Sequence, residues 1–213
     1  LATYILFGPV ELEGLQNVAE RAEIIADFTE LGQAAQHMGD IDGDGVNDLV
    51  FVRDTDSMDT VSIIFGGPEW PRHLTLNDVD RNVAMGGIDP DSVQVLNWNG
   101  DDNADLLLRA GDLAYVVDGQ AIEQGGPVDG APLLTDPIIV LSNSIAILNA
   151  ENLEAPIRIG DVNGDGLDDL LFLGDHGATE TERNAYLVLG RPEPAAIDTL
   201  TAAEVVFEGV LNP

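Results

Sequence analysis

Short apolar runs separated by turn residues recur along the whole chain, and no long amphipathic helix interrupts them. Three runs follow acidic loops: "DLVFV" (48–52), "DLLLRA" (105–110) and "DLLFL" (169–173). They are rich in Leu, Val and Phe, and Gly and Asp bound them, as is typical of buried strands. Four other runs end at a glycine: "TYILFGP" (3–9), "VSIIFGGPE" (61–69), "LAYVVDGQ" (113–120) and "AYLVLGRPE" (185–193). The pattern predicts an all-β protein.

The strands group into a repeat. The acidic loops begin at residues 40, 97 and 161, which are 57 and 64 residues apart. Further strands are predicted in "EIIADF" (23–28), "NVAMGG" (82–87), "SVQVLN" (92–97), "PIRIG" (156–160) and "EVVFEG" (204–209). Each unit then has about four short antiparallel strands, with the acidic loop between its first and second strands. This arrangement is that of one β-propeller blade.

The blades can be counted along the chain. Residues 1–30 form the end of one blade, 31–88 a blade, 89–150 a blade with a degraded loop, and 151–213 a blade. Residues 1–213 are therefore a single, partial propeller of about three and a half blades. Residues 119–137 are predicted to form a Gly- and Pro-rich loop, and 138–148 the outer strand of the middle blade. The remaining blades would come from the same longer chain, another chain or a second copy.

The acidic loops have the spacing of a metal site. In the first loop, side-chain oxygens recur at positions 1, 3, 5 and 9, with glycine at positions 4 and 6 and a backbone carbonyl at position 7. A hard cation such as Ca²⁺ binds 6–8 oxygens, and glycine permits the sharp bend. The predicted ligands are Asp40, Asp42, Asp44, the Val46 carbonyl and Asp48 in the first loop; Asn97, Asn99, Asp101, the Asn103 carbonyl and Asp105 in the second; and Asp161, Asn163, Asp165, the Leu167 carbonyl and Asp169 in the third.

The three loops differ in carboxylate count, which falls from four in the first loop to three in the third and two in the second. We expect calcium affinity to follow that order, with two main sites and a weaker third. An EF-hand is excluded. It needs a bidentate Glu at position 12 and a following helix, whereas Phe51 and Phe172 occupy that position and a strand follows.

Composition narrows the possible partners. The chain has 39 acidic and 8 basic residues, all of the latter arginine, and a formal net charge of −31. No basic face can form, which excludes nucleic acid as a partner. No apolar run approaches the roughly 18 residues of a membrane-spanning helix, so no membrane insertion is expected. There is no cysteine, and therefore no disulfide or thiolate site.

The loops "GDIDGDGVNDLVFV" and "GDVNGDGLDDLLFLG", with the "FG" of "ILFGP" and "IIFGG", resemble FG-GAP repeats. These repeats occur in the β-propellers of integrin α-chains and in many bacterial secreted proteins. The second repeat departs from the pattern, with Asn at two ligand positions and "VVDG" in place of "FG". The resemblance implies a Ca²⁺-binding propeller, integrin-like and possibly seven-bladed. It also implies that calcium is bound by Asp40, Asp42, Asp44 and Asp48, and by Asp161, Asn163, Asp165 and Asp169.

The sequence lacks the motifs of a nucleophile elbow, a phosphate loop or a zinc protease. We therefore expect a non-catalytic, calcium-binding module that mediates adhesion or contacts with a protein or glycan. Calcium is plentiful outside cells, which favours an extracellular, periplasmic or cell-surface location. Two alternatives stay open: the propeller part of a secreted hydrolase or lyase, and a salt-adapted surface or matrix protein.

Overall fold

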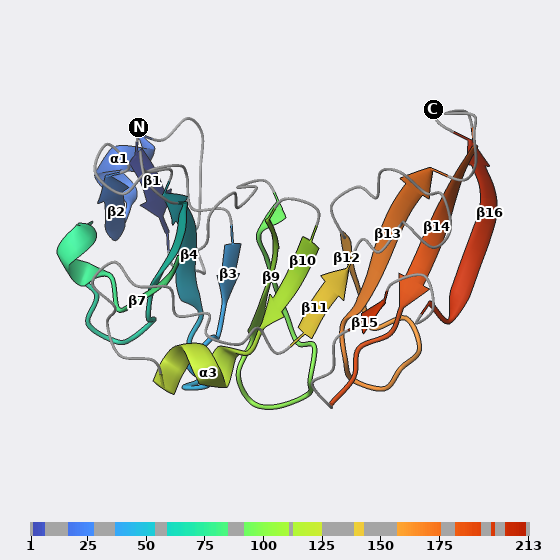
Figure 1. Cartoon of the computed structure of the whole chain (residues 1–213). Helices are drawn as coiled ribbons and strands as arrows, with labels where there is room; N and C mark the ends of the chain where they lie inside the picture. Colours follow the sequence, from blue (N-terminus) through green and yellow to red (C-terminus); the bar gives the residue numbers. More distant parts are fainter. Residues whose placement is uncertain are drawn as a thin grey trace.

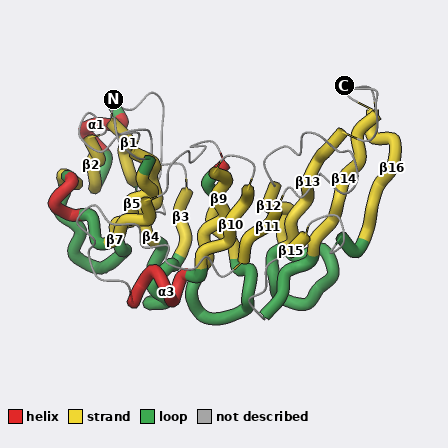
Figure 2. The backbone as a smooth tube through the Cα atoms, viewed as in Figure 1, coloured by secondary structure: helices red, strands yellow, loops and turns green. Residues whose placement is uncertain are grey.

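The structure, a computed structural model, describes residues 2–6, 17–27, 37–53, 59–84, 92–110, 113–124, 139–142, 157–175, 182–192, 197–198 and 203–211. Within them the protein is all-β, with four sheets that stand side by side in chain order (Figure 1). Figure 2 shows that the helices are few and short. They are α1 (Val18–Arg21), the 3₁₀ turn η1 (Leu76–Asp78) and α3 (Gly119–Gln124).

The first sheet has the order β1-β2-β6 and the second the order β3-β4-β5-β7. The strands are β1 (Ala2–Ile5), β2 (Ile24–Asp27), β3 (His37–Gly39), β4 (Asp48–Arg53), β5 (Thr60–Ile64), β6 (His73–Leu74) and β7 (Arg81–Ala84). The second sheet is antiparallel throughout.

The third sheet has the order β15-β11-β10-β9-β8 and the fourth the order β12-β13-β14-β16. Their strands are β8 (Gln94–Leu96), β9 (Asp105–Ala110), β10 (Leu113–Val117), β11 (Ile139–Ser142), β12 (Ile157–Gly160), β13 (Asp169–Asp175), β14 (Glu182–Val188), β15 (Ile197–Asp198) and β16 (Val205–Leu211). In these two sheets and the second, the predicted acidic loop joins the first strand to the second, as expected.

Two strands depart from the predicted antiparallel pattern. The two-residue strands β6 and β15 pair in parallel with β2 and β11, the outermost strands of the preceding sheets. Each comes from the connection between the last two strands of the following sheet. They cover an edge that would otherwise expose unpaired backbone groups.

The apolar runs are continuous because their strands are buried on both faces. In β4, Leu49 and Phe51 pack toward the first sheet, with Ile24 and Leu74, in one apolar cluster. Val50 and Val52 lie in another cluster with residues of the third sheet. Side chains of a strand alternate between its two faces, so a strand between two sheets needs apolar residues at every position.

The middle sheet repeats this arrangement. Leu106 and Leu108 of β9 pack with the second sheet. Leu107 packs with Trp98, Leu170 and Phe172, and so joins the third sheet to the fourth. The first strands of the successive sheets are also neighbours, because β3 contacts β8 and β8 contacts β12. One edge of the second, third and fourth sheets therefore lies on the same side of the molecule.

The prediction that residues 119–137 form a loop is wrong at its start. Residues 119–124 form α3, and Asp118 accepts the backbone N–H of Gln120 at 2.7 Å. Ile122 is buried in the cluster between the second and third sheets, and this burial stabilises the short helix. Residues 125–138 lie outside the described part. The predicted strand of 138–148 is present as β11, at residues 139–142.

Candidate metal centre

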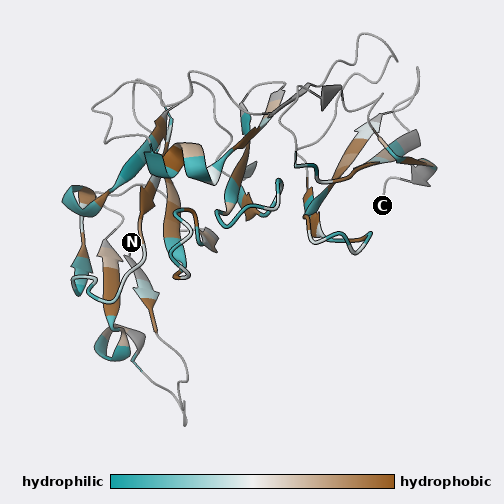
Figure 3. Cartoon of the chain, turned by 90° about the horizontal axis from the view of Figure 1, so that it is seen from below, coloured by the Kyte–Doolittle hydropathy of each residue, from teal (hydrophilic) through white to brown (hydrophobic). Residues whose placement is uncertain are grey.

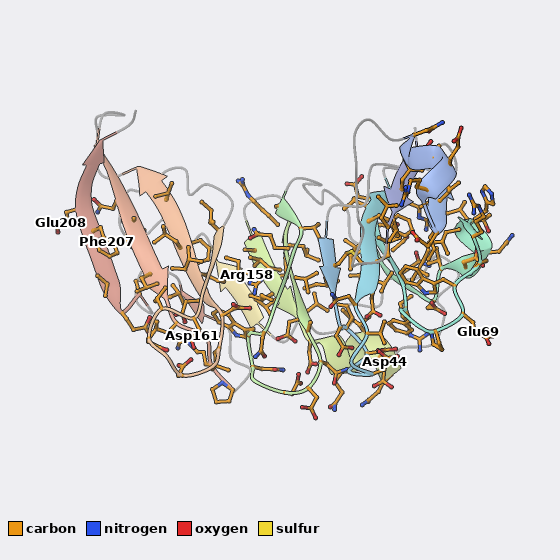
Figure 4. The ribbon with its side chains drawn as sticks, turned by 180° about the vertical axis from the view of Figure 1, so that it is seen from behind. Asp44, Glu69, Arg158, Asp161, Phe207 and Glu208 are labelled. Carbon is orange, nitrogen blue, oxygen red and sulfur yellow. The ribbon has the colours of Figure 1, made fainter. Side chains whose placement is uncertain are left out.

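The three acidic loops lie at one edge of the row of sheets. Figure 3, seen from below, shows loops with teal, hydrophilic segments at the ends of brown, hydrophobic strands. Figure 4 shows Asp44 and Asp161, from the first and third loops, at the same edge. In each loop, glycines adopt the left-handed backbone that the bend requires, for example Gly43 (φ 76°) and Gly45 (φ 86°).

The first loop brings three carboxylates together. Asp40, Asp42 and Asp48 each place one oxygen within 4.8 Å of the others, and the described residues contain one such group. Asp40 Oδ2 accepts the backbone N–H of Gly45 at 2.8 Å, whereas its Oδ1 is buried and has no hydrogen-bond partner among the described residues. An unpaired buried carboxylate oxygen is costly unless a cation binds it.

Asp44 and Val46 lie in the same loop but outside this group of three. Asp44 is exposed, and its Oδ1 accepts the backbone N–H of Val46 at 2.7 Å. The predicted roles of the Asp44 side chain and the Val46 carbonyl in metal binding stay predictions.

The charges of the first loop favour a bound cation. Burial raises the pKa of Asp48 to about 6, against the lowering effect of hydrogen bonds from Gly66 and Ile41. Burial, and then the nearby carboxylates of Asp44 and Asp40, raise the pKa of Asp42. Three close carboxylates repel one another when ionised, and a divalent cation removes that repulsion. Oxygen-only donors fit a hard cation such as Ca²⁺ or Mg²⁺.

The third loop is more open. Asp161, Asn163 and Asp165 are exposed, and Leu167 is half-buried. Asp161 accepts the N–H groups of Gly164 (2.6 Å) and Gly166 (2.8 Å), and the Gly166 hydrogen bond lowers the pKa of Asp161. Asn163 donates to Asp165 at 2.8 Å. Among the described residues, the acidic side chains of this loop do not form a group of three like that of Asp40, Asp42 and Asp48. The predicted metal ligands of the third loop, with Asn163 among them, stay predictions.

The middle loop uses two of its asparagines to contact its neighbours. Asn103 is buried and donates to the Ile41 carbonyl in the first loop at 2.8 Å. Asn97 donates to the Gly166 carbonyl in the third loop at 3.0 Å. Asn99 donates to Asp101 at 3.0 Å within the loop. The side-chain amides of Asn97 and Asn103 join the loops into one row, a role that could not be read from the sequence.

The aspartate at position 9 is a structural residue in all three loops. Its carboxylate is buried and accepts two backbone N–H groups, one from position 2 of its own loop and one from a glycine two residues after the sheet's third strand. For Asp48 the donors are Ile41 (2.6 Å) and Gly66 (2.6 Å); for Asp105, Trp98 (2.9 Å) and Gly119 (3.1 Å); for Asp169, Val162 (2.8 Å) and Gly190 (3.0 Å).

This contact explains the recurring glycine. A Cβ atom on Gly66 would lie 2.5 Å from the Asn47 carbonyl oxygen, and one on Gly190 would lie 2.7 Å from the Asp168 carbonyl oxygen. A Cβ atom on Gly119 would clash with the carbonyl of Ala104. The sequence contained the signal, an Asp before one strand and a Gly after the next, but the distances between them appear only in the fold.

Metal-free stability is expected to fall as the pH rises from 5 to 7.5. Burial raises the pKa of Asp105 to about 7 and that of Asp48 to about 6. In the unfolded chain the pKa of an aspartate is about 3.9. Between these values the folded protein binds more protons, so raising the pH favours unfolding. The melting temperature in chelator should therefore be several degrees lower at pH 7.5 than at pH 5.

The Asp105→Asn variant is the control for this titration, because it removes the share due to Asp105 and should flatten the pH dependence. A metal-free melting temperature that rises between pH 5 and pH 7.5 would contradict the assignment of these two pKa values.

No protein-family model and no curated protein matches the chain. Among the described residues, no helix is long and apolar enough to cross a membrane.

Proposed function

We propose that the chain is a non-catalytic, calcium-binding module of a β-propeller of the FG-GAP type, acting outside the cytosol in contacts with a protein or glycan. The observation that carries the proposal is the buried, unpaired Oδ1 of Asp40 beside the carboxylates of Asp42 and Asp48. A Ca²⁺ ion there would bind this oxygen and neutralise a group that otherwise destabilises the loop.

The propeller architecture is supported by how the sheets follow one another. The second and fourth sheets have four antiparallel strands in chain order, and so does the third apart from its added strand β15. The neighbouring first strands β3, β8 and β12 would then line the central axis. The second and third sheets each pack against both neighbouring sheets through apolar clusters, as adjacent blades pack in a propeller.

The fourth sheet has an outer face suited to a further blade. Its register places Ile157, Leu171, Leu187 and Val205 side by side on that face. Ile157, Val205 and the neighbouring Phe207 are exposed. Figure 4 shows Phe207 on β16, at the end of the row of sheets. In the second and third sheets the corresponding apolar face is covered by the following sheet, so a further sheet of the same type is the occupant we propose here.

Calcium is expected to stabilise the protein specifically. A ligand at 100 times its dissociation constant adds about 2.7 kcal/mol to the free energy of unfolding, which corresponds to several degrees in melting temperature. The measurement is thermal unfolding with excess Ca²⁺, with excess Mg²⁺ and in EDTA. Because the chain carries a net charge of −31, all three are recorded at high ionic strength, which screens non-specific ion binding.

Asp42→Asn tests the site itself. The variant keeps an oxygen for the hydrogen bond from the backbone N–H of Asp44 (3.2 Å) but removes one of three converging charges. Calcium affinity by titration calorimetry should fall by about tenfold or more, with little loss of metal-free stability. Asp102→Asn is the matched control, because Asp102 is exposed and is not a predicted ligand. Equal calcium affinity of Asp42→Asn and Asp102→Asn would refute the assignment of the site.

A further inference from the structure

Consecutive loops are joined by the same backbone hydrogen bond. The position-8 N–H of one loop donates to the position-1 carbonyl of the loop before it. The distances are 2.6 Å from Ala104 to Asp40 and 2.7 Å from Asp168 to Asn97. Asn47 is the position-8 residue of the first loop, so its N–H has the place of the donor toward a loop that would precede it.

We call the contact between two consecutive loops a joint. The position-2 residue of the first of the two loops also contributes to it. Ile41 and Trp98 are 0 % and 1 % exposed, because each side chain enters the apolar cluster that it shares with the following sheet. The backbone carbonyls of both residues accept hydrogen bonds from the following sheet. Ile41 accepts from the Asn103 side chain in that sheet's loop (2.8 Å), and Trp98 accepts from the backbone N–H of Arg191, just after that sheet's third strand (3.1 Å). Val162, the position-2 residue of the third loop, is 53 % exposed.

The position-7 residue covers the preceding loop. Leu167 lies against Gly100, where an added Cβ would be 2.7 Å from a leucine methyl carbon. Asn103 lies against Gly43, where an added Cβ would be 3.2 Å from Asn103 Oδ1. Val46 has position 7 in the first loop and is 42 % exposed. It lines an apolar cavity of about 210 Å³ together with Met38, Asn47, Gly66, Gly67 and Trp70. We call this cavity the front seat.

The front seat therefore lies where the other two joints hold a preceding loop. Asn47 offers the donor for a position-1 carbonyl, Val46 offers the cover for a position-4 glycine, and the cavity has room for a position-2 side chain. Gly67 corresponds to Arg191, whose N–H donates to a position-2 carbonyl. The apolar lining fits an aliphatic or aromatic residue, which is what Ile41, Trp98 and Val162 are.

Strand β1 supplies the second half of the argument. The parallel strand β6 pairs with β2 as β15 pairs with β11, which is the fourth strand of its sheet. By this correspondence β1 and β2 are the third and fourth strands of their sheet. Among the described residues β1 pairs only with β2, so its other edge is open where a second strand would pair.

We propose that the front seat and the open edge of β1 together bind one strand–loop–strand hairpin of the chain's own repeat type. Its second strand pairs antiparallel with β1, and its loop carries an apolar residue at position 2 that enters the front seat. In the second and third sheets the second strand is joined to the third by a short connection, from Arg53 to Thr60 and from Ala110 to Leu113. The occupant is accordingly a hairpin joined covalently to β1.

A whole second copy of the chain does not fit this seat. Its fourth sheet presents a loop with an exposed Val162, but that sheet has all four strands, and two of them would overlap β1 and β2. The inference rests on the proposed propeller architecture and not on calcium. It can therefore be tested in chelator, where the calcium assignment plays no part.

The test supplies the hairpin. A copy of residues 37–58 is fused directly before Leu1, because "YILFG" (4–8) aligns with "SIIFG" (62–66) and Leu1 then corresponds to Asp59. The chain has no cysteine, so Val46→Cys in the original loop introduces one thiol in the front seat. In the fusion its rate of modification should fall by about tenfold or more, as expected for a group reached only through local opening.

The matched control is the same fusion with aspartate in place of isoleucine at position 2 of the appended loop. It has the same length and the same connection but a charge that the apolar seat excludes. The seat is assigned if the isoleucine fusion protects the thiol and raises the melting temperature, and the aspartate fusion does neither.

Equal thiol reactivity in the fusion and in the unfused protein would overturn the proposal, as would equal protection by both fusions. Concentration-dependent protection in the unfused protein, with dimers in sedimentation, would assign the seat to a second copy and would also overturn it. Protection in EDTA without any calcium response would keep this inference and reject the proposed calcium site. A calcium response without protection would do the reverse.

Discussion

Asp105→Ala is expected to destabilise the protein by about 2–6 kcal/mol, because it leaves two buried N–H groups without an acceptor at about 1–3 kcal/mol each. The carboxylate of Asp105 is 1 % exposed and accepts from Trp98 at 2.9 Å and from Gly119 at 3.1 Å. The bond from Gly119 joins the middle loop to the start of α3, just after β10. Urea unfolding in EDTA measures the change without a contribution from calcium.

The control for this prediction is Asp102→Ala in the same loop. Asp102 is exposed, and its replacement should change the free energy of unfolding by no more than about 0.5 kcal/mol. Asp105→Asn should fall between the two, since its amide oxygen accepts one N–H while its amide nitrogen faces the other. A loss below about 1 kcal/mol for Asp105→Ala would show that burial of this carboxyl costs as much as its hydrogen bonds contribute.

The strands could be predicted because burial on both faces leaves a direct trace in the sequence. "DLVFV" and "DLLFL" have no polar alternation, and the structure shows why. Leu49 packs with the first sheet, and the next residue, Val50, packs with the third. The loops before these runs were also predictable, because Gly43 and Gly45 occur where the left-handed backbone requires them.

Features that depend on contacts between distant residues could not be predicted. Strands β6 and β15 have two residues each, too short for a periodic pattern. The helix α3 lies in a Gly-rich stretch and depends on burial of Ile122 against another sheet. The local sequence does not show which strand pairs with β6 or β15, or which sheet buries Ile122.

The candidate site shows the same division. Spacing placed Asp40, Asp42 and Asp48 in one loop, and the structure brings their carboxylates together. Spacing gave the Asn103 backbone carbonyl a place in a metal loop but assigned no role to its side-chain amide, which donates to the Ile41 carbonyl of the loop before it. A repeat pattern identifies equivalent positions, but it does not show which side chains a neighbouring repeat uses.

Trp98→Ala is expected to cost about 3–5 kcal/mol, the range for removing a large buried aromatic side chain. Trp98 belongs to the apolar cluster between the third and fourth sheets, together with Leu107, Leu170 and Phe172. Trp98 is the largest of the fully buried side chains among the described residues, so its removal would leave a large cavity between the third and fourth sheets. In a protein of this size the loss corresponds to roughly 10 °C in melting temperature.

Trp98→Phe separates packing from hydrogen bonding at the same position. The indole Nε1 of Trp98 is buried and has no hydrogen-bond partner among the described residues, a state that costs about 1–3 kcal/mol. Phenylalanine removes that donor while it keeps most of the apolar contact, so its cost should be less than half that of alanine. Both variants are compared by urea unfolding in EDTA. If Trp98→Phe proves as destabilising as Trp98→Ala, the indole N–H has a partner in solution, and its hydrogen bond contributes to the joint as much as packing does.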